Sequence, residues 1–146
     1  MRFSWELEIA QPLERVLEVL EDPDHPLAWQ PGLVSITSWE GKLGAEGSVA
    51  SYQYDLDGQY FELRETIVVN QTPAEHTARY EGRGMVHTVT NRFEPADVGT
   101  TRLVSRHQGY FTGVVRLLSP LLRRPMRERW RVELARFRTY VETGER

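Results

Sequence analysis

The sequence of 146 residues contains no cysteine. This absence excludes disulfide bonds, a thiol nucleophile and thiolate metal ligands. The chain also lacks any apolar run close to the roughly 18 residues that a membrane-spanning helix needs. Its first residues alternate like a strand and have no apolar stretch typical of a signal peptide. We therefore expect a cytoplasmic protein with one domain over residues 1–146.

Acidic residues are scarce near the C-terminus, although the net charge is only −3. Residues 1–100 carry 17 acidic and 7 basic side chains, a net charge of −10, whereas residues 101–146 carry 4 acidic and 11 basic ones, a net charge of +7. The simpler interpretation is that the two parts neutralise each other in the fold. The alternative is a basic face for an anionic partner.

The last quarter of the chain, residues 114–142, has the periodicity of one long amphipathic helix. Its bulky apolar residues recur at spacings of three and four, which places them on one stripe: Met126, Trp130, Leu134, Phe137 and Val141. Pro120 and Pro125 interrupt the upstream part of the pattern. Because proline removes a backbone hydrogen bond from a helix interior, we expect a separate first segment or a kink near one of them.

Most of the chain before this helix alternates between apolar and polar residues, as half-buried strands do. The first predicted strand covers residues 2–9, and a short helical pair follows, with a helix after Gln11-Pro12 and a turn at residues 27–29. Glycine and proline turns then separate six further strands, at residues 34–40, 48–56, 60–70, 75–82, 85–94 and 100–108. Consecutive strands of this kind form an antiparallel meander, which can curve around the terminal helix and leave a cavity.

Several short segments stand along the chain in a characteristic order and spacing: residues 10–16 (AQPLERV), 29–32 (WQPG), 44–48 (GAEGS), 93–95 (FEP) with 99–102 (GTTR), and the terminal helix. Together they resemble the START-like, helix-grip superfamily. Within that superfamily the chain is similar to the polyketide cyclase/dehydrase and lipid-transport group, SRPBCC. The resemblance implies an α+β fold with a curved antiparallel seven-stranded sheet around the long C-terminal helix, and a deep, mostly apolar internal cavity. It does not imply one reaction, because members include lipid carriers, hormone receptors, aromatases and cyclases.

Strand alternation predicts which side chains point at the helix and line such a pocket. On the last strand the expected inward set is Thr101, Leu103, Ser105 and His107. The expected ligand-binding residues are mostly aromatic and apolar, as in small-molecule sites generally: Trp29, Tyr52, Tyr54, Phe61, Glu65, Met85, His87, Val89, Asn91, Leu103, His107, Tyr110, Met126 and Trp130. Of these, Trp29 and Tyr110 should lie near an opening.

The candidate catalytic residues are His87, His107 and Glu65. A cyclase or dehydratase needs a general base and a hydrogen-bond donor for the developing enolate oxygen. Either histidine could be the base, with Tyr54 or Asn91 as the donor. The sequence contains these groups without requiring that they react.

The same candidates have a structural interpretation. The two histidines can be ordinary hydrogen-bonded residues of the wall, and Glu65 can pair with an arginine such as Arg106. No ligand spacing such as His-Glu-x-x-His accompanies them, so we expect no metal and no cofactor. A Gly-x-Ser-x-Gly motif and a phosphate-binding glycine loop are also absent from the sequence.

Three functions remain open. The residues favour binding or transport of a small hydrophobic ligand, lipid-like or polyketide-like, because this function requires no reactive side chain. The first alternative is an aromatase/cyclase- or dehydratase-type enzyme that uses the same pocket. The second is an interaction module, in which exposed Arg123, Arg124 and Arg127 contact an anionic membrane peripherally. We expect a monomer or homodimer, and no nucleic-acid partner, because no nucleic-acid-binding motif is present and the overall charge is acidic.

Overall fold

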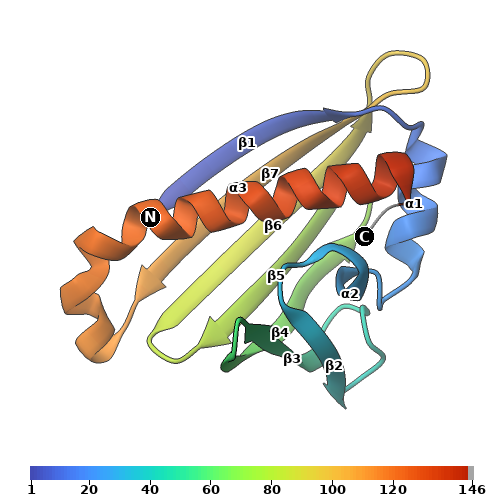
Figure 1. Ribbon diagram of the computed structural model, residues 1–146. Helices are drawn as coiled ribbons and strands as arrows, with labels where there is room; N and C mark the ends of the chain where they lie inside the picture. Colours follow the sequence, from blue (N-terminus) through green and yellow to red (C-terminus); the bar gives the residue numbers. More distant parts are fainter. Residues whose placement is uncertain (145–146) are drawn as a thin grey trace.

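A curved antiparallel sheet wraps around a long C-terminal helix, which crosses its concave face (Figure 1). The structure is a computed structural model, and it describes residues 1–144. Its sheet has the strand order β1-β7-β6-β5-β4-β3-β2. The strands are β1 Arg2–Ile9, β2 Leu33–Glu40, β3 Val49–Leu56, β4 Gln59–Gln71, β5 Glu75–Gly82, β6 Met85–Pro95 and β7 Thr101–Phe111. The predicted α+β helix-grip fold with seven strands is confirmed.

Short turns make β2 to β7 a meander, and β1 closes the sheet by pairing with β7 at the other edge. The alternation predicted for the first and last strands holds, because Phe3 lies opposite His107 and Leu7 lies opposite Leu103 on the inner face. Strand β7 continues past its predicted end at residue 108, since Met85 at the start of β6 still pairs with Phe111.

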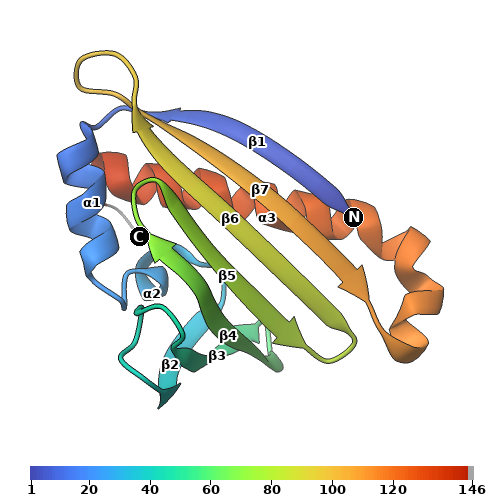
Figure 2. The ribbon, with the colours of Figure 1, turned by 180° about the vertical axis from the view of Figure 1, so that it is seen from behind.

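Two short helices, α1 Leu13–Glu21 and α2 Pro26–Trp29, connect β1 to β2 and lie at one end of the sheet (Figure 2). Pro12 precedes α1 and Pro26 begins α2, at positions where a missing N–H removes no helical hydrogen bond. Val16 and Val19 of α1 are buried and anchor this helix in the core.

The C-terminal segment divides into a 3₁₀ helix, η1 Gly113–Leu118, and the α-helix α3 Ser119–Thr143. The expected separate first segment is thus confirmed, with Pro120 in the first turn of α3 and Pro125 inside the helix. The predicted stripe faces the sheet, and its buried members are Trp130, Leu134, Phe137 and Val141. No helix described in residues 1–144 combines the length and the hydropathy needed to span a membrane.

The apolar core forms two clusters. The larger one lies beneath α1 and the second half of α3, and its buried members include Val16, Phe93 and Phe137. The smaller one lies on β2 and β3 and includes Tyr52 and Tyr54. A cavity separates them, and residues of both clusters line it.

Candidate functional site

A cavity of about 580 Å³ lies between the concave face of the sheet and the helices α2 and α3. It is lined by most of the residues that the sequence predicts as ligand-binding: Trp29, Tyr52, Tyr54, Glu65, Met85, His87, Val89, Asn91, Leu103, His107, Met126 and Trp130. Strand alternation brings together the members on β3, β4, β6 and β7, and the stripe of α3 supplies the last two.

Two of the predicted wall residues lie elsewhere, so the prediction is wrong for them. Tyr110 is 59% exposed on the outer face of β7, because its neighbours Gly109 and Phe111 point inward, and it marks no opening. Phe61 is not part of the lining, although it shares the inward face of β4 with Glu65: its ring stacks on Tyr54 with centroids 4.8 Å apart and lies 5.2 Å from the Arg129 guanidinium.

A chain of hydrogen bonds runs along the inner face of β6 and β7. The antiparallel register places Asn91 opposite Ser105, and His107 one inward position further along β7. His87 Nε2 lies 3.0 Å from His107 Nδ1, His107 Nε2 lies 2.8 Å from Ser105 Oγ, and Ser105 Oγ donates to Asn91 Oδ1 over 2.6 Å. Both candidate histidines therefore belong to one buried network.

The network has a direction, because a serine hydroxyl has one proton to donate. Ser105 gives this proton to Asn91, so His107 Nε2 donates to Ser105, and His107 Nδ1 accepts from His87 Nε2. The Nδ1 atom of neutral His87 is then an acceptor, and it has no hydrogen bond within residues 1–144. Every fully buried polar side-chain atom in those residues has a partner, so this nitrogen is open to the cavity.

Burial keeps both histidines neutral. It lowers the pKa of His107 to about 4, and together with His107 and Arg129 it lowers the pKa of His87 well below its usual value. The ring of His87 lies flat on Trp130, with centroids 3.9 Å apart and planes 12° apart. Gly109, opposite His87 on β7, makes room for this stack, since a Cβ there would lie 3.1 Å from Trp130 Cη2.

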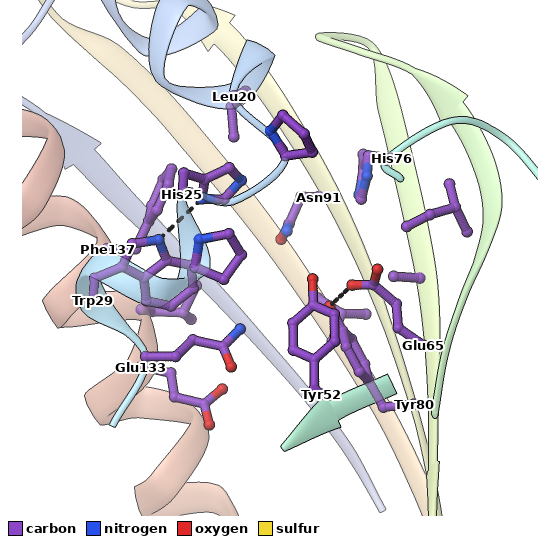
Figure 3. Close-up of a pocket in the computed structure, with 18 of the residues that line it drawn as sticks. Leu20, His25, Trp29, Tyr52, Glu65, His76, Tyr80, Asn91, Glu133 and Phe137 are labelled. Atoms are coloured by element: carbon purple, nitrogen blue, oxygen red, sulfur yellow. Dashed lines mark hydrogen bonds between the residues drawn. The ribbon is translucent and has the colours of Figure 1, made fainter. Parts of the chain in front are cut away.

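Glu65 of β4 forms a second polar group on the sheet, and it is only 5% exposed. Tyr80 Oη donates to Glu65 Oε2 over 2.7 Å, and the Tyr52 hydroxyl points toward the same carboxylate (Figure 3). Burial raises the pKa of Glu65, while the two tyrosine hydroxyls oppose the shift. The alternative interpretation, an ion pair between Glu65 and an arginine such as Arg106, fails for Arg106, because β7 directs this side chain to the exposed outer face.

On the opposite side, α3 places an ion pair at the cavity. Arg129 Nε lies 3.1 Å from Glu133 Oε1, and the guanidinium lies 5.5 Å from the ring centre of Tyr54. Tyr54 Oη in turn donates to Gln30 Oε1 over 2.6 Å. Burial raises the pKa of Glu133, and Arg129 opposes this shift. The ion pair therefore brings no net charge to the wall.

The sequence of residues 2–142 matches the protein family described as polyketide cyclase / dehydrase and lipid transport. The chain belongs to this family. No curated protein sequence matches it significantly.

Solved structures share the fold of this polyketide cyclase/dehydrase and lipid-transport family member. One is a protein from Thermus thermophilus, with a TM-score of 0.76 and 17% identity over 100% of both chains. Another is the ZhuI aromatase/cyclase from a Streptomyces species, with a TM-score of 0.71 and 15% identity over 99% of this chain and 97% of that one. Truncated norcoclaurine synthase from Thalictrum flavum has a TM-score of 0.69 and 14% identity over 98% of this chain and 94% of that one. At such identities the likeness concerns the fold alone.

Two further histidines of this family member line the cavity and are absent from the predicted set. Trp29 Nε1 donates to His25 Nδ1 over 3.0 Å, and burial lowers the pKa of His25 to about 4 although Asp22 opposes the shift. Burial also lowers the pKa of His76 on β5. His76 could have been found, because it shares the inward face of β5 with Ala78 and Tyr80. His25 carries no such signal, since it precedes a helix of only four residues.

Within residues 1–144, no three His, Asp or Glu side chains are placed to hold a metal ion together. The histidines bond to each other and to Ser105, and Glu65 bonds to tyrosines. The cavity wall contains a neutral hydrogen-bond acceptor, His87, and a buried carboxylate, Glu65, and aromatic rings lie next to both. Such a site suits an uncharged, largely apolar molecule with few polar groups.

Proposed function

We propose that this protein binds a small hydrophobic molecule, with a ring system or an acyl chain, in the cavity between its sheet and α3. The observation that carries the proposal is the open Nδ1 acceptor of His87, which lies beside the ring of Trp130 in a largely aromatic and apolar wall. A polar atom in such a wall is costly unless water or a ligand bonds it. A donor group on the ligand would satisfy this atom and fix the orientation of the molecule.

The size and charge of the cavity support the same proposal. Its volume of about 580 Å³ lies within the range of roughly 300–1,000 Å³ that is typical of small-molecule sites. The lowered pKa values of His87 and His107 remove positive charge from the wall at neutral pH. An uncharged ligand therefore fits better than a phosphate or a carboxylate.

An enzyme with the same pocket is the second candidate, and the network His87–His107–Ser105–Asn91 favours it. A base at His87 could take a proton from a carbonyl-activated C–H group, and the network would hold the ring in place. However, a general base works best when its pKa lies near the working pH, and burial moves the pKa of His87 well below it. Binding without turnover is thus the better supported function.

Native mass spectrometry of the purified protein tests the proposal first, because a bound molecule should add a discrete mass. Affinity for that molecule and its turnover are then measured for the wild type, His87→Ala and His107→Ala. If the protein binds without turnover, each substitution should weaken binding by about 1–3 kcal/mol, the usual scale of one polar contact. If it is an enzyme, one substitution should lower the rate by about 10²–10⁴-fold with a much smaller change in affinity.

Thr88→Ala is the matched control, since Thr88 neighbours His87 on β6 but faces away from the cavity. This variant should leave the affinity for the bound molecule and its turnover unchanged. Unchanged affinity and turnover in both histidine variants would show that the network is structural and that the ligand does not contact it.

A further inference from the structure

The segment formed by η1 and the start of α3 exposes a cluster of apolar side chains. Val114, Leu117 and Leu121 are 79%, 81% and 75% exposed, and Leu118 is 51% exposed. We call these four residues the η1 tip. None of the residues of η1 is buried. Single exposed leucines are ordinary, but a contiguous apolar cluster usually marks an interaction site.

The η1 tip projects from the body of the protein. In Figures 1 and 2, η1 and the first turns of α3 lie beyond the end of β7, whereas α1 and the β6–β7 loop lie at the opposite end of the sheet. The apolar side chains are thus presented at one extremity of the molecule, away from the elements that cover the core.

Four exposed arginines lie in or directly after the same segment: Arg116, Arg123, Arg124 and Arg127. Residues 111–127 contain no acidic side chain, and none of the four arginines has a salt bridge within the described residues. Arg123 and Arg127 instead lie over the ring of Phe3, at 5.6 and 5.2 Å from its centre. The expectation that Arg123, Arg124 and Arg127 are exposed is confirmed.

The positive charge of the C-terminal part is therefore not neutralised by the fold at this end. Salt bridges from this part to the first 100 residues come from Arg102, which reaches Glu8 and Glu94. Arg129 and Arg131 pair within α3. The simpler interpretation, in which the two oppositely charged parts of the chain cancel, fails for the arginines that accompany the η1 tip.

An anionic membrane surface is the partner that matches exposed apolar residues accompanied by unpaired arginines. A second copy of this chain would bring two sets of arginines face to face across a two-fold axis, which like-charge repulsion opposes. A bilayer with anionic lipids matches both features, because leucines enter the interface while arginines remain at the headgroups. We propose that the η1 tip and its arginines dock this protein on an anionic membrane surface.

Co-sedimentation with vesicles tests this docking on the full chain. One set of vesicles contains phosphatidylcholine alone, and the other contains phosphatidylcholine with phosphatidylglycerol. The wild type should bind the anionic vesicles, bind the neutral ones more weakly, and dissociate as salt is added. Arg123→Gln and Arg124→Gln should each weaken binding roughly fivefold, the effect of one basic residue near such a surface.

Leu117→Ser with Leu121→Ser should weaken binding by roughly tenfold or more, because two apolar side chains no longer leave water. Val98→Ser is the matched control, since Val98 is fully exposed in the β6–β7 loop at the opposite end and should not affect binding. All these positions are exposed, so the variants should unfold at the wild-type temperature, which thermal unfolding checks.

Four results would overturn the proposal: no binding to anionic vesicles, equal binding to neutral ones, wild-type binding by both the leucine and the arginine variants, or equal loss of binding in the Val98 variant. Sedimentation equilibrium tests the alternative that a second copy of this chain, and not a membrane, covers the η1 tip. If the wild type is a dimer that Leu117→Asp dissociates, and it does not bind vesicles, the η1 tip is an interface between two copies.

Discussion

All four histidines of the chain line the cavity, and burial lowers the pKa of each one. In the unfolded chain their pKa values return to about 6.5. Between the folded and the unfolded pKa, the unfolded chain binds more protons than the native protein, so acid favours unfolding. The neutral wall of the cavity is therefore a source of stability that is present above the unfolded pKa and is lost as the pH falls through the folded one.

We predict that the free energy of unfolding decreases as the pH falls from about 6.5 to about 4. The pKa of His107 is lowered to about 4, so this residue alone should contribute up to about 1.4 kcal/mol per pH unit in that interval. Denaturant titrations at a series of pH values measure the slope. His107→Gln should make it shallower, while no slope from the histidines is expected between pH 7 and 8. An equally steep slope in the variant would contradict the burial of a neutral His107.

The carboxyl group of Glu65 changes stability with pH in the opposite direction to the histidines, because its pKa is raised in the folded protein. Its contribution to stability is complete below the unfolded pKa and is lost as the pH rises through the folded value. Glu65→Gln keeps the shape and can keep the contact with Tyr80 without a charge. We predict that this variant is more stable than the wild type at pH 7, and that the difference shrinks toward pH 4.5. A variant that is less stable at pH 7 would show that the tyrosines stabilise the ionised form enough to offset its burial.

Side-chain directions in strands were predictable, but contacts across strands were not. Alternation placed Ser105 and His107 on the inner face of β7 because the other face carries Arg102 and Arg106. The bond from Ser105 to Asn91 depends on the register of β6 against β7, which alternation alone does not determine. The same limitation explains the wrong partner for Glu65: the hydroxyl that bonds it lies on β5, directly opposite in the register.

At the scale of elements, α3 is held by its buried stripe, with Trp130 at the centre. This side chain is 1% exposed and stacks on both His87 and His107. Trp130→Ala should lower the free energy of unfolding by about 3–5 kcal/mol, the usual cost of truncating a buried aromatic residue. Chemical denaturation measures this loss as a lower midpoint concentration, with an unchanged dependence of the unfolding free energy on denaturant concentration.

Arg138→Ala is the control on the exposed side of the same helix, and it should change stability by less than about 0.5 kcal/mol. If the Trp130 and Arg138 variants unfold at the same denaturant concentration as the wild type, the helix does not cross the sheet as described.

The long elements were predicted because they repeat one pattern over many residues. The stripe of α3 and the alternation of β1 and β7 each bury one face, and burial of one face is what produces periodicity in a sequence. The helix α2 spans four residues, too few to repeat, so His25 just before it was missed, although Trp29 at its end was among the predicted residues. The apolar residues of η1 follow no such pattern of burial: the sheet ends before it can cover them, and none of them is buried.

At the scale of the whole molecule, the fold keeps two core clusters apart instead of packing them into one. The space between them is bounded by ring stacks and hydrogen bonds that do not require a ligand: Trp130 on His87, Tyr80 on Glu65, and Arg136, which bonds the carbonyl of Trp29 over 2.7 Å. These contacts connect α3, α2 and the sheet around the cavity. Because these contacts hold the cavity open without a ligand, a larger side chain pointing into it should fit without distorting the sheet.

Ala78→Phe tests this property of the whole molecule. Ala78 is 2% exposed at the centre of the inner face of β5, between Ile67 and Val89. In a close-packed core the larger side chain would cost about 1–3 kcal/mol, but here the ring can enter the cavity, so we predict a loss below about 1 kcal/mol. Binding of Nile red, a neutral apolar probe, should fall because the ring occupies the site. Val68→Phe, on the exposed outer face of β4, is the control and should leave probe binding unchanged. A large loss of stability with undiminished probe binding would mean that the probe binds outside the cavity and that the space beside Ala78 is closed.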